Sequence, residues 1–204
     1  MSIVLVGSTS GSCTLQEQAV AGTTVLTLPT TSGTVLTSAS SVTRSQLPVG
    51  SVLQVVSTPL QGTFSMSGTS QVAITGLTAT ITPTSASNNI LIMVTIGGYA
   101  QGSGQGRFIL TKASSTISGA IGTTAGSRLS DTFTIAMASG GVTQVTGGIT
   151  YLDSPATTSA TTYGVTVSSN DAGQAIYINY SSADTDNNGA QRNISTITVM
   201  EIAA

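Results

Sequence analysis

The feature that most constrains this sequence is a succession of short apolar runs, rich in valine, isoleucine and threonine, separated by glycine, serine and proline. Residues 132–137, 162–167 and 175–180 show the pattern clearly, because apolar side chains occupy every second position. A period of two places these side chains on one face of a β-strand, and β-branched residues fit that pleated surface. The sequence therefore predicts an all-β fold.

From residue 51 onward, about nine such runs recur at intervals typical of a sandwich or barrel, and a β-sandwich with jelly-roll topology is expected. Residues 89–96, "NILIMVTI", are apolar almost without interruption, which predicts a central strand covered on both faces. In residues 71–82 the apolar phase switches at Gly76, which predicts a bulge or bend there.

The chain divides into three parts by its pattern of turns and strands. Residues 1–37 form a small N-terminal array of strands and turns. Residues 38–50 lack sustained alternation and are expected to be a linker, and residues 51–204 form the C-terminal β-sandwich domain. Within the first part, residues 22–38 read as two short strands that are too small to form a core of their own.

Charged residues are scarce. They make up 6% of the chain, against roughly 25% in ordinary soluble proteins. The formal net charge is −2, and the five basic residues are scattered rather than clustered. Because neutralising phosphates requires clustered lysine and arginine, no nucleic-acid partner is expected. So small a net charge also offers little repulsion between copies, which favours self-association.

No segment indicates membrane insertion or secretion. The longest apolar runs are four or five residues long, such as "IVLV" and "ILIMV", and a membrane span needs about 18. The start "MSIVLVGSTS" lacks the charged beginning and long apolar stretch of a secretory signal, so we expect synthesis in a cytoplasm. Cys13 is the one cysteine, which excludes an intrachain disulfide and predicts a small buried residue.

The sequence argues against an enzyme. It contains no histidine, so a serine or cysteine nucleophile would have no imidazole base and a zinc site would lose its commonest ligand. The chain contains enough aspartates for the pair of carboxylates that glycoside hydrolysis uses, so this activity stays open. The candidates all fall in or beside predicted turns, where aspartate commonly satisfies the backbone: Asp131, Asp153, Asp171, Asp184 and Asp186. The glycine-rich "GSGQG" at 102–106 precedes no helix, and no cofactor is expected.

One segment resembles the start of a calcium loop. In "DTDNNG", Asp184, Asp186 and Asn188 place oxygen ligands at alternate positions before a glycine. The later positions do not fit, because Arg192 stands at position 9 and Ser195 replaces the bidentate glutamate at position 12. These three residues are weak metal candidates, and a plain turn is the preferred interpretation.

Tyr99 is the aromatic residue singled out as a possible surface contact. It lies beside "GGYAQGSGQG", where an exposed tyrosine could stack on a sugar or a partner. Tyr163 and Tyr180, by contrast, continue alternating apolar faces and are expected to be in the core. The loops 97–106 and 182–192 are the predicted contact regions.

Residues 7–37 resemble a module of tail-fibre and related structural proteins of tailed bacteriophages, especially phages of aquatic bacteria. The shared marks are a "TSGS-TLQ" opening, an "AVAGT" turn, a "TLTLP" strand and a "GTVLT" end, and this chain has "TSGSCTLQ", "AVAGT", "TVLTLP" and "GTVLT" in that order. The segments "VLQVVST", "TGLTATITPTSASNNILIMV" and "ISTITVMEI" are similar to the globular domain that follows the module in such proteins.

The resemblance implies a homotrimeric virion protein in which residues 1–37 are an attachment and assembly region and the C-terminal β-domain is exposed on the particle. Such a protein is expected to be non-enzymatic, to contact other virion proteins and to attach to the host surface, where a glycan is a possible partner. A short tail fibre, a tail-tip knob and a capsid decoration protein stay open, as does the less favoured polysaccharide depolymerase. The 22–38 pair would then bury its apolar side chains against neighbouring copies or a virion partner. These assembly contacts are Val25, Leu26, Leu28, Val35 and Leu36.

Overall fold

The computed structural model describes residues 3–6, 12–15, 30, 41–136, 144–181 and 184–204. The chain divides into two compact units, Met1–Val42 and Thr43–Ala204. In the first unit, β1 (Ile3–Val6) pairs antiparallel with β2 (Ser12–Leu15). The predicted 22–38 pair and its five assembly residues lie outside the described residues, apart from Thr30.

The second unit is built from strands and two short 3-10 helices, and no α-helix occurs among its described residues. The helices are η1 (Arg44–Gln46) and η2 (Ser118–Ala120). The strands are β3 (Val52–Leu60), β4 (Phe64–Ser67), β5 (Val72–Ile81), β6 (Asn89–Ala100), β7 (Gln105–Lys112), β8 (Ser115–Thr116), β9 (Phe133–Ala136), β10 (Val145–Asp153), β11 (Thr161–Ser169), β12 (Ala175–Ile178) and β13 (Ser195–Ile202).

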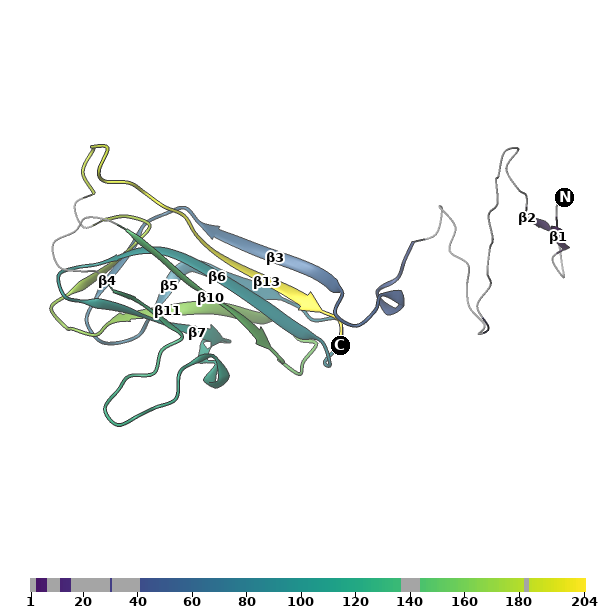
Figure 1. The fold of residues 1–204 in the computed structure, drawn as a ribbon, viewed down its shortest axis with the longest axis horizontal. Helices are drawn as coiled ribbons and strands as arrows, with labels where there is room; N and C mark the ends of the chain where they lie inside the picture. The colour runs from purple at the N-terminus through teal and green to yellow at the C-terminus, as the bar shows by residue number, and fades with distance from the viewer. Residues whose placement is uncertain (1–2, 7–11, 16–29, 31–40, 137–143, 182–183) are drawn as a thin grey trace. The chain divides into compact units, whose positions relative to one another are not determined.

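These strands form two antiparallel sheets that pack face to face (Figure 1). The six-stranded sheet contains β3, β13, β6, β12 and β4 in that order, with β10 paired to β6. The five-stranded sheet contains β5, β11, β7 and β8, with β9 paired to β7. The predicted all-β sandwich is confirmed, and the jelly-roll topology stays a prediction.

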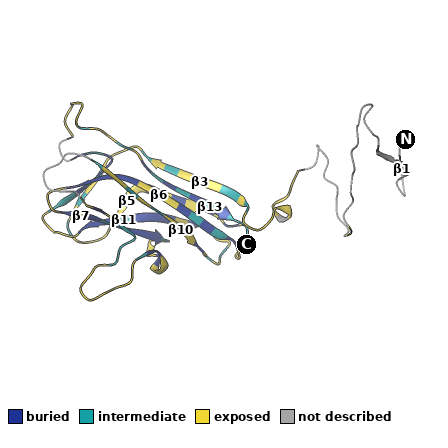
Figure 2. Cartoon of the chain, viewed as in Figure 1, coloured by how far each residue is buried: buried dark blue, intermediate teal, exposed yellow. Residues whose placement is uncertain are grey.

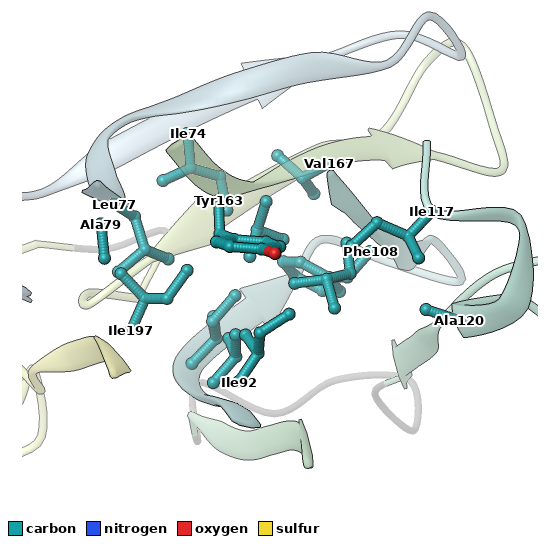
Figure 3. Close-up of a cluster of buried hydrophobic side chains, with 14 of the residues drawn as sticks. Ile74, Leu77, Ala79, Ile92, Phe108, Ile117, Ala120, Tyr163, Val167 and Ile197 are labelled. Carbon is teal, nitrogen blue, oxygen red and sulfur yellow. The ribbon is translucent and has the colours of Figure 1, made fainter. Parts of the chain in front are cut away.

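The core lies between the two sheets and is made of the inward side chains of both (Figure 3). Tyr163 and Phe108, from the five-stranded sheet, are fully buried and face Ile92 and Ile197 of the six-stranded sheet. The Phe108 ring stacks on Phe133 with a centroid distance of 4.8 Å. The predicted burial of Tyr163 is confirmed, whereas Tyr180 is only partly buried.

Strand β6 is central in the six-stranded sheet, as predicted, because it pairs with β13 and β12 and also with β10. The prediction that both its faces are covered is wrong. Ile90, Ile92 and Val94 are buried, but Met93 on the opposite face is 42% exposed. The reason is architectural: the second sheet of a sandwich covers only one face of the first.

The predicted irregularity at Gly76 is confirmed. The pairing of β5 with β11 shifts between Ala73 opposite Thr166 and Thr78 opposite Gly164, and Gly76 lies in the extra length on β5. Gly76 has a φ of 85°, which lies in a backbone region that side-chain-bearing residues seldom adopt. Because the bulge shifts the alternation of side chains along β5, the apolar residues before and after Gly76 point into the same core.

Candidate functional site

The outer face of the six-stranded sheet carries an apolar row that crosses four strands. Met200 on β13 lies opposite Val55 on β3 and Leu91 on β6, and Leu91 lies opposite Leu152 on β10. Val55 is 54% exposed and Leu152 is 51% exposed, while the two central residues are partly exposed. Figure 2 shows exposed positions alternating with buried ones along these strands. We call this set the apolar row.

Other apolar residues extend the apolar row in both directions along the strands. Val52 and Ile202 are paired at one end, and both are at least partly exposed. Met93 follows on the other side, opposite Thr198 and Thr150. Contiguous exposed apolar surface of this kind is a mark of an interaction site, whereas isolated exposed apolar residues are ordinary. The outward-facing side chains of β3, β13, β6 and β10 are together called the outer face.

Farther along the outer face, hydroxyl-bearing side chains replace the apolar ones. Ser57 and Thr198 are hydrogen-bonded across β3 and β13 at 2.8 Å. Gly147 and Gly148 on β10 open a hollow of about 360 Å³ beside Met93 and Thr95. A second hollow of about 650 Å³ shares Thr95 and Thr146 with the first and reaches Gln61, Arg192 and Asn193. The outer face therefore has an apolar part and a hollowed polar part.

The second unit begins and ends at the same edge of the sandwich, which we call the base. The Gly50 amide donates to the Ala203 carbonyl at 2.8 Å, and the Ala203 amide donates to the Ser51 carbonyl at 2.9 Å. These bonds include Gly50 and Ser51, so the end of the predicted linker is hydrogen-bonded to the C-terminal segment. Residues 61–63, 101–104 and 184–194 lie at the opposite end, called here the tip (Figure 1).

A buried carboxylate holds three segments of the chain together at the base of the sandwich. Glu201 is fully buried, and its oxygens accept hydrogen bonds from the Thr84 amide at 2.6 Å, the Asn88 amide nitrogen at 2.7 Å and the Gln54 amide nitrogen at 2.6 Å. Burial by itself would raise the pKa of the Glu201 carboxyl, but these hydrogen bonds outweigh it and hold that pKa below its usual range. The ionised side chain thus connects β13, β3 and the 82–88 loop.

A second buried cluster joins the two sheets. Asp153 on β10 accepts a hydrogen bond from the Tyr163 hydroxyl of β11 at 2.6 Å, and Lys112 Nζ of β7 lies 3.0 Å from the same carboxylate. Burial, together with the bond to Asp153 and its charge, raises the pKa of the Tyr163 hydroxyl well above its usual range. A hydroxyl held protonated in this way is a hydrogen-bond donor rather than a base or nucleophile.

Three of the four remaining aspartates proposed for a catalytic pair have structural partners. Asp131 receives two hydrogen bonds from Arg107, at 3.0 Å and 2.7 Å. Asp184 receives two from Arg192, at 3.1 Å and 2.9 Å. Asp171 accepts the Gly173 amide within its own turn, at 3.0 Å. Asp131, Asp153 and Asp184 are thus each held by a different cationic side chain.

The weak metal candidates lie in the loop that precedes β13. Both oxygens of Asp184 face the Arg192 guanidinium, and the Asn187 side chain accepts the Gly189 amide at 2.8 Å, which is a turn interaction. Asp186 and Asn188 are exposed in the same loop. Among the residues that the structure describes, no cluster of three or more histidine, cysteine, aspartate or glutamate side chains could hold a metal ion.

The expectation that Tyr99 is exposed is wrong. Tyr99 is only 8% exposed and lies near the end of β6, opposite Tyr177 of β12, with a ring-centroid distance of 5.9 Å. The glycines around it suggested a loop, but β6 continues to Ala100 and the turn consists of residues 101–104. Tyr99 therefore belongs to the sheet and not to a contact loop.

Sequence reasoning did not identify the outer face. The signal was present, because the uninterrupted apolar run at 89–96 requires a cover for its odd-numbered positions as well as for its even-numbered ones. The structure buries Ile90, Ile92, Val94 and Ile96 within the chain and leaves Leu91 and Met93 on the outside. The outer face therefore includes exposed apolar side chains of the central strand.

Comparison with known proteins gives no family for this chain: neither the protein-family models nor the curated proteins include a match. No helix in the described part of the chain has the length and apolar character that crossing a membrane requires.

Proposed function

We propose that this chain is a non-enzymatic structural protein of a tailed-phage virion, and specifically a short homotrimeric tail fibre. In this role the first unit attaches to other virion proteins and the second unit contacts the host surface. The proposal rests on the resemblance of residues 7–37 to the phage module and on the layout of the second unit.

The observation that carries the proposal is the separation of base and tip in the second unit. The chain arrives and ends at the base, where Gly50 and Ala203 are hydrogen-bonded. The loops at 61–63, 101–104 and 184–194 project from the tip (Figure 1). A domain attached through its base presents its tip to whatever it meets, which is the arrangement that a receptor-binding knob requires.

The chemistry of the tip suits a neutral, hydroxyl-rich ligand such as a host surface glycan. The larger hollow is lined by the amides of Gln61 and Asn193, the hydroxyls of Thr95 and Thr146, and the Arg192 guanidinium. Arg192 is already paired with Asp184, so the hollow has little unbalanced charge. Hydroxyl and amide groups of this kind exchange hydrogen bonds with sugar hydroxyls.

The test is to locate the chain on particles and to remove its first unit. Immunogold labelling at the tail tip is expected, whereas labelling over the head would replace the fibre with a capsid decoration protein. Deleting residues 1–37 is expected to abolish incorporation while Thr43–Ala204 still folds. Normal incorporation of the truncated chain would contradict the proposed division of roles.

The depolymerase alternative has its own measurement. It requires release of new reducing ends from host glycans, and that release must be lost when the aspartates are replaced one at a time by asparagine. We expect no release, because Asp131, Asp153 and Asp184 are held by Arg107, Lys112 and Arg192. Release that depends on any of them would overturn the non-enzymatic assignment.

A further inference from the structure

We infer that Asn188 is a site of spontaneous covalent modification, at which its side-chain amide is converted to a carboxylate, and that the neighbouring Asn187 side chain slows this conversion. Asn188–Gly189 is the one Asn-Gly pair in the sequence. The inference goes beyond the proposed function and does not rest on it, because the reaction needs only water and the loop itself.

The chemistry of the Asn-Gly pair is intramolecular. The backbone nitrogen of Gly189 attacks Cγ of Asn188, and the new C–N bond closes a five-membered imide ring. The bond from Cγ to Nδ2 breaks, and ammonia leaves with the proton that the Gly189 nitrogen gave up. Water then opens the ring at either carbonyl and gives aspartate or isoaspartate. Glycine favours the attack because it has no side chain to crowd the nitrogen and its backbone moves easily.

The Asn188 side chain is accessible for this reaction. Asn188 and Gly189 are both exposed and occupy the centre of a turn at the tip. The turn is closed by the Ala190 amide, which donates to the Asn187 carbonyl at 3.1 Å. Among the residues that the structure describes, none is hydrogen-bonded to the Asn188 side chain. The amide group of Asn188 is therefore in contact with water and is not tied to a partner there.

The Asn187 side chain opposes the first step. The Gly189 N–H donates to Asn187 Oδ1 at 2.8 Å. Because the nitrogen must lose this proton before it can attack, a hydrogen bond to the protonated form disfavours the reaction. Asn187 is itself held in place, since its Nδ2 donates to Thr185 Oγ1 at 2.6 Å. Both ends of the Asn187 amide group are thus engaged, one of them on the attacking nitrogen.

The conversion would change both the charge and the backbone of the tip loop. It adds one negative charge to a chain whose formal net charge is −2. Arg192, the cation that lines the larger hollow, lies in the same loop and is paired with Asp184 at 2.9 Å. A carboxylate at Asn188 would compete for that guanidinium. The isoaspartate product would also lengthen the backbone inside the turn that the bond from Ala190 to Asn187 closes.

The first experiment follows the folded full chain over time in neutral and in mildly alkaline buffer. Chymotryptic peptides are analysed by mass spectrometry, which detects the exchange of an amide for a carboxyl group, and chromatography separates isoaspartate from aspartate. A digest of fresh protein gives the starting value. Conversion at Asn188 is expected, and it should be faster at the higher pH because more of the Gly189 nitrogen is deprotonated.

Asn170 is the matched control within the same sample. It is also exposed, but Asp171 follows it, and its Oδ1 accepts the Gln105 amide at 2.6 Å. Chymotrypsin cuts after Tyr177 and Tyr180, so the two asparagines fall in different peptides. Asn170 is expected to stay unmodified. Equal conversion at Asn170 and Asn188 would overturn the special reactivity of the Asn-Gly pair.

The second experiment tests the role of Asn187. Asn187→Ala removes the acceptor of the Gly189 amide and is expected to speed conversion at Asn188 about fivefold, which corresponds to one hydrogen bond of about 1 kcal/mol. Asn187→Asp keeps an oxygen acceptor and should convert no faster than the wild type. An unchanged rate in Asn187→Ala, or an equal increase in both variants, would overturn the role given to the hydrogen bond.

The third experiment tests the attacking atom. Gly189→Ala places a methyl group beside the nitrogen, and its Cβ would lie 3.2 Å from Asn187 Oδ1, so the exposed turn needs only a small shift to hold it. In this variant Asn188 should remain asparagine over the period in which the wild type converts. Conversion at the wild-type rate would exclude attack by the Gly189 nitrogen. No conversion at Asn188 in the wild type and in Asn187→Ala would overturn the site altogether.

These outcomes are distinguishable from a failure of the proposed function. Conversion at Asn188 in a protein never found on particles would keep the modification site and remove the virion role. A chain located at the tail tip whose Asn188 stays intact in every variant would keep the fibre and remove the modification site.

Discussion

The Tyr163 hydroxyl donates a hydrogen bond of 2.6 Å to the Asp153 carboxylate, and this bond joins the two sheets of the sandwich. Asp153 lies at the end of β10 in one sheet, and Tyr163 lies near the start of β11 in the other. Lys112 provides the balancing charge from β7, at 3.0 Å. The cluster is polar, buried and internally satisfied, which is the condition under which such a group stabilises a core.

Removing one member of this cluster should destabilise the fold according to what is left unpaired. Tyr163→Phe keeps the ring and removes the hydrogen bond, so unfolding free energy should fall by about 1–2 kcal/mol. Asp153→Ala leaves the Lys112 charge without its partner and should cost about 3 kcal/mol, less than a fully buried pair because Lys112 is partly exposed. Urea unfolding followed by tyrosine fluorescence measures both.

The control for that series is Asp184→Asn, which breaks the exposed ion pair with Arg192. A solvent-exposed pair of this kind contributes little to stability, so the unfolding midpoint should hardly move. If Asp184→Asn lowered the unfolding free energy as much as Asp153→Ala, the stability loss in this series would not depend on burial of the ion pair.

Glu201 should make the fold sensitive to acid. Its pKa is lowered in the folded chain, so its contribution to stability is present above the unfolded value of 4.5 and is lost as pH falls through the folded value. We expect the melting temperature of the wild type to drop more steeply below about pH 4.5 than that of Glu201→Gln. Parallel slopes for the two proteins in thermal melts would assign the acid sensitivity to other carboxylates.

Gly148 should not tolerate a side chain. A Cβ at this position would collide with the carbonyl oxygen of Val94 on the neighbouring strand, and backbone atoms cannot move aside cheaply. Gly148→Ala is expected to lower unfolding free energy by about 1–3 kcal/mol, the usual range for an overpacked site. Gly62→Ala is the matched control, since open space surrounds that glycine. Equal stability of the two variants in urea unfolding would contradict the close approach of β10 to β6.

The 184–189 loop should not respond to calcium. Both oxygens of Asp184 are engaged by Arg192, so a cation would have to displace a guanidinium before it could bind. Adding millimolar calcium should leave the melting temperature unchanged, and so should a chelator. A rise in melting temperature with calcium that disappears in Asp184→Asn would restore the metal site.

Strand positions were predictable where alternation was strong. The runs at 107–112, 132–137, 162–167 and 175–180 all contain strands of the structure. Two strands were not predicted. Residues 64–67 alternate apolar side chains with serine over only four positions, and residues 115–116 are too few to show any period. Both form because a neighbouring strand supplies a pairing edge, which local sequence does not record.

The candidate site was less predictable than the fold, because it depends on which strands become neighbours. Val55, Leu91, Leu152 and Met200 come from four separate parts of the chain, and only strand register aligns them. Tyr99 shows the opposite failure: glycine on both sides suggested exposure, yet pairing of β6 with β12 buries the ring.

The sequence by itself determined the all-β class, the position of the central strand and the bulge at Gly76, because period and glycine placement act through the local backbone. Only the tertiary structure decided which face of that central strand is covered, since burial depends on the second sheet. Tertiary pairing likewise brought Asp153 to Tyr163 and Glu201 to Asn88, across separations of 10 and 113 residues. Those contacts form only when distant strands fold together, so no local pattern could specify them.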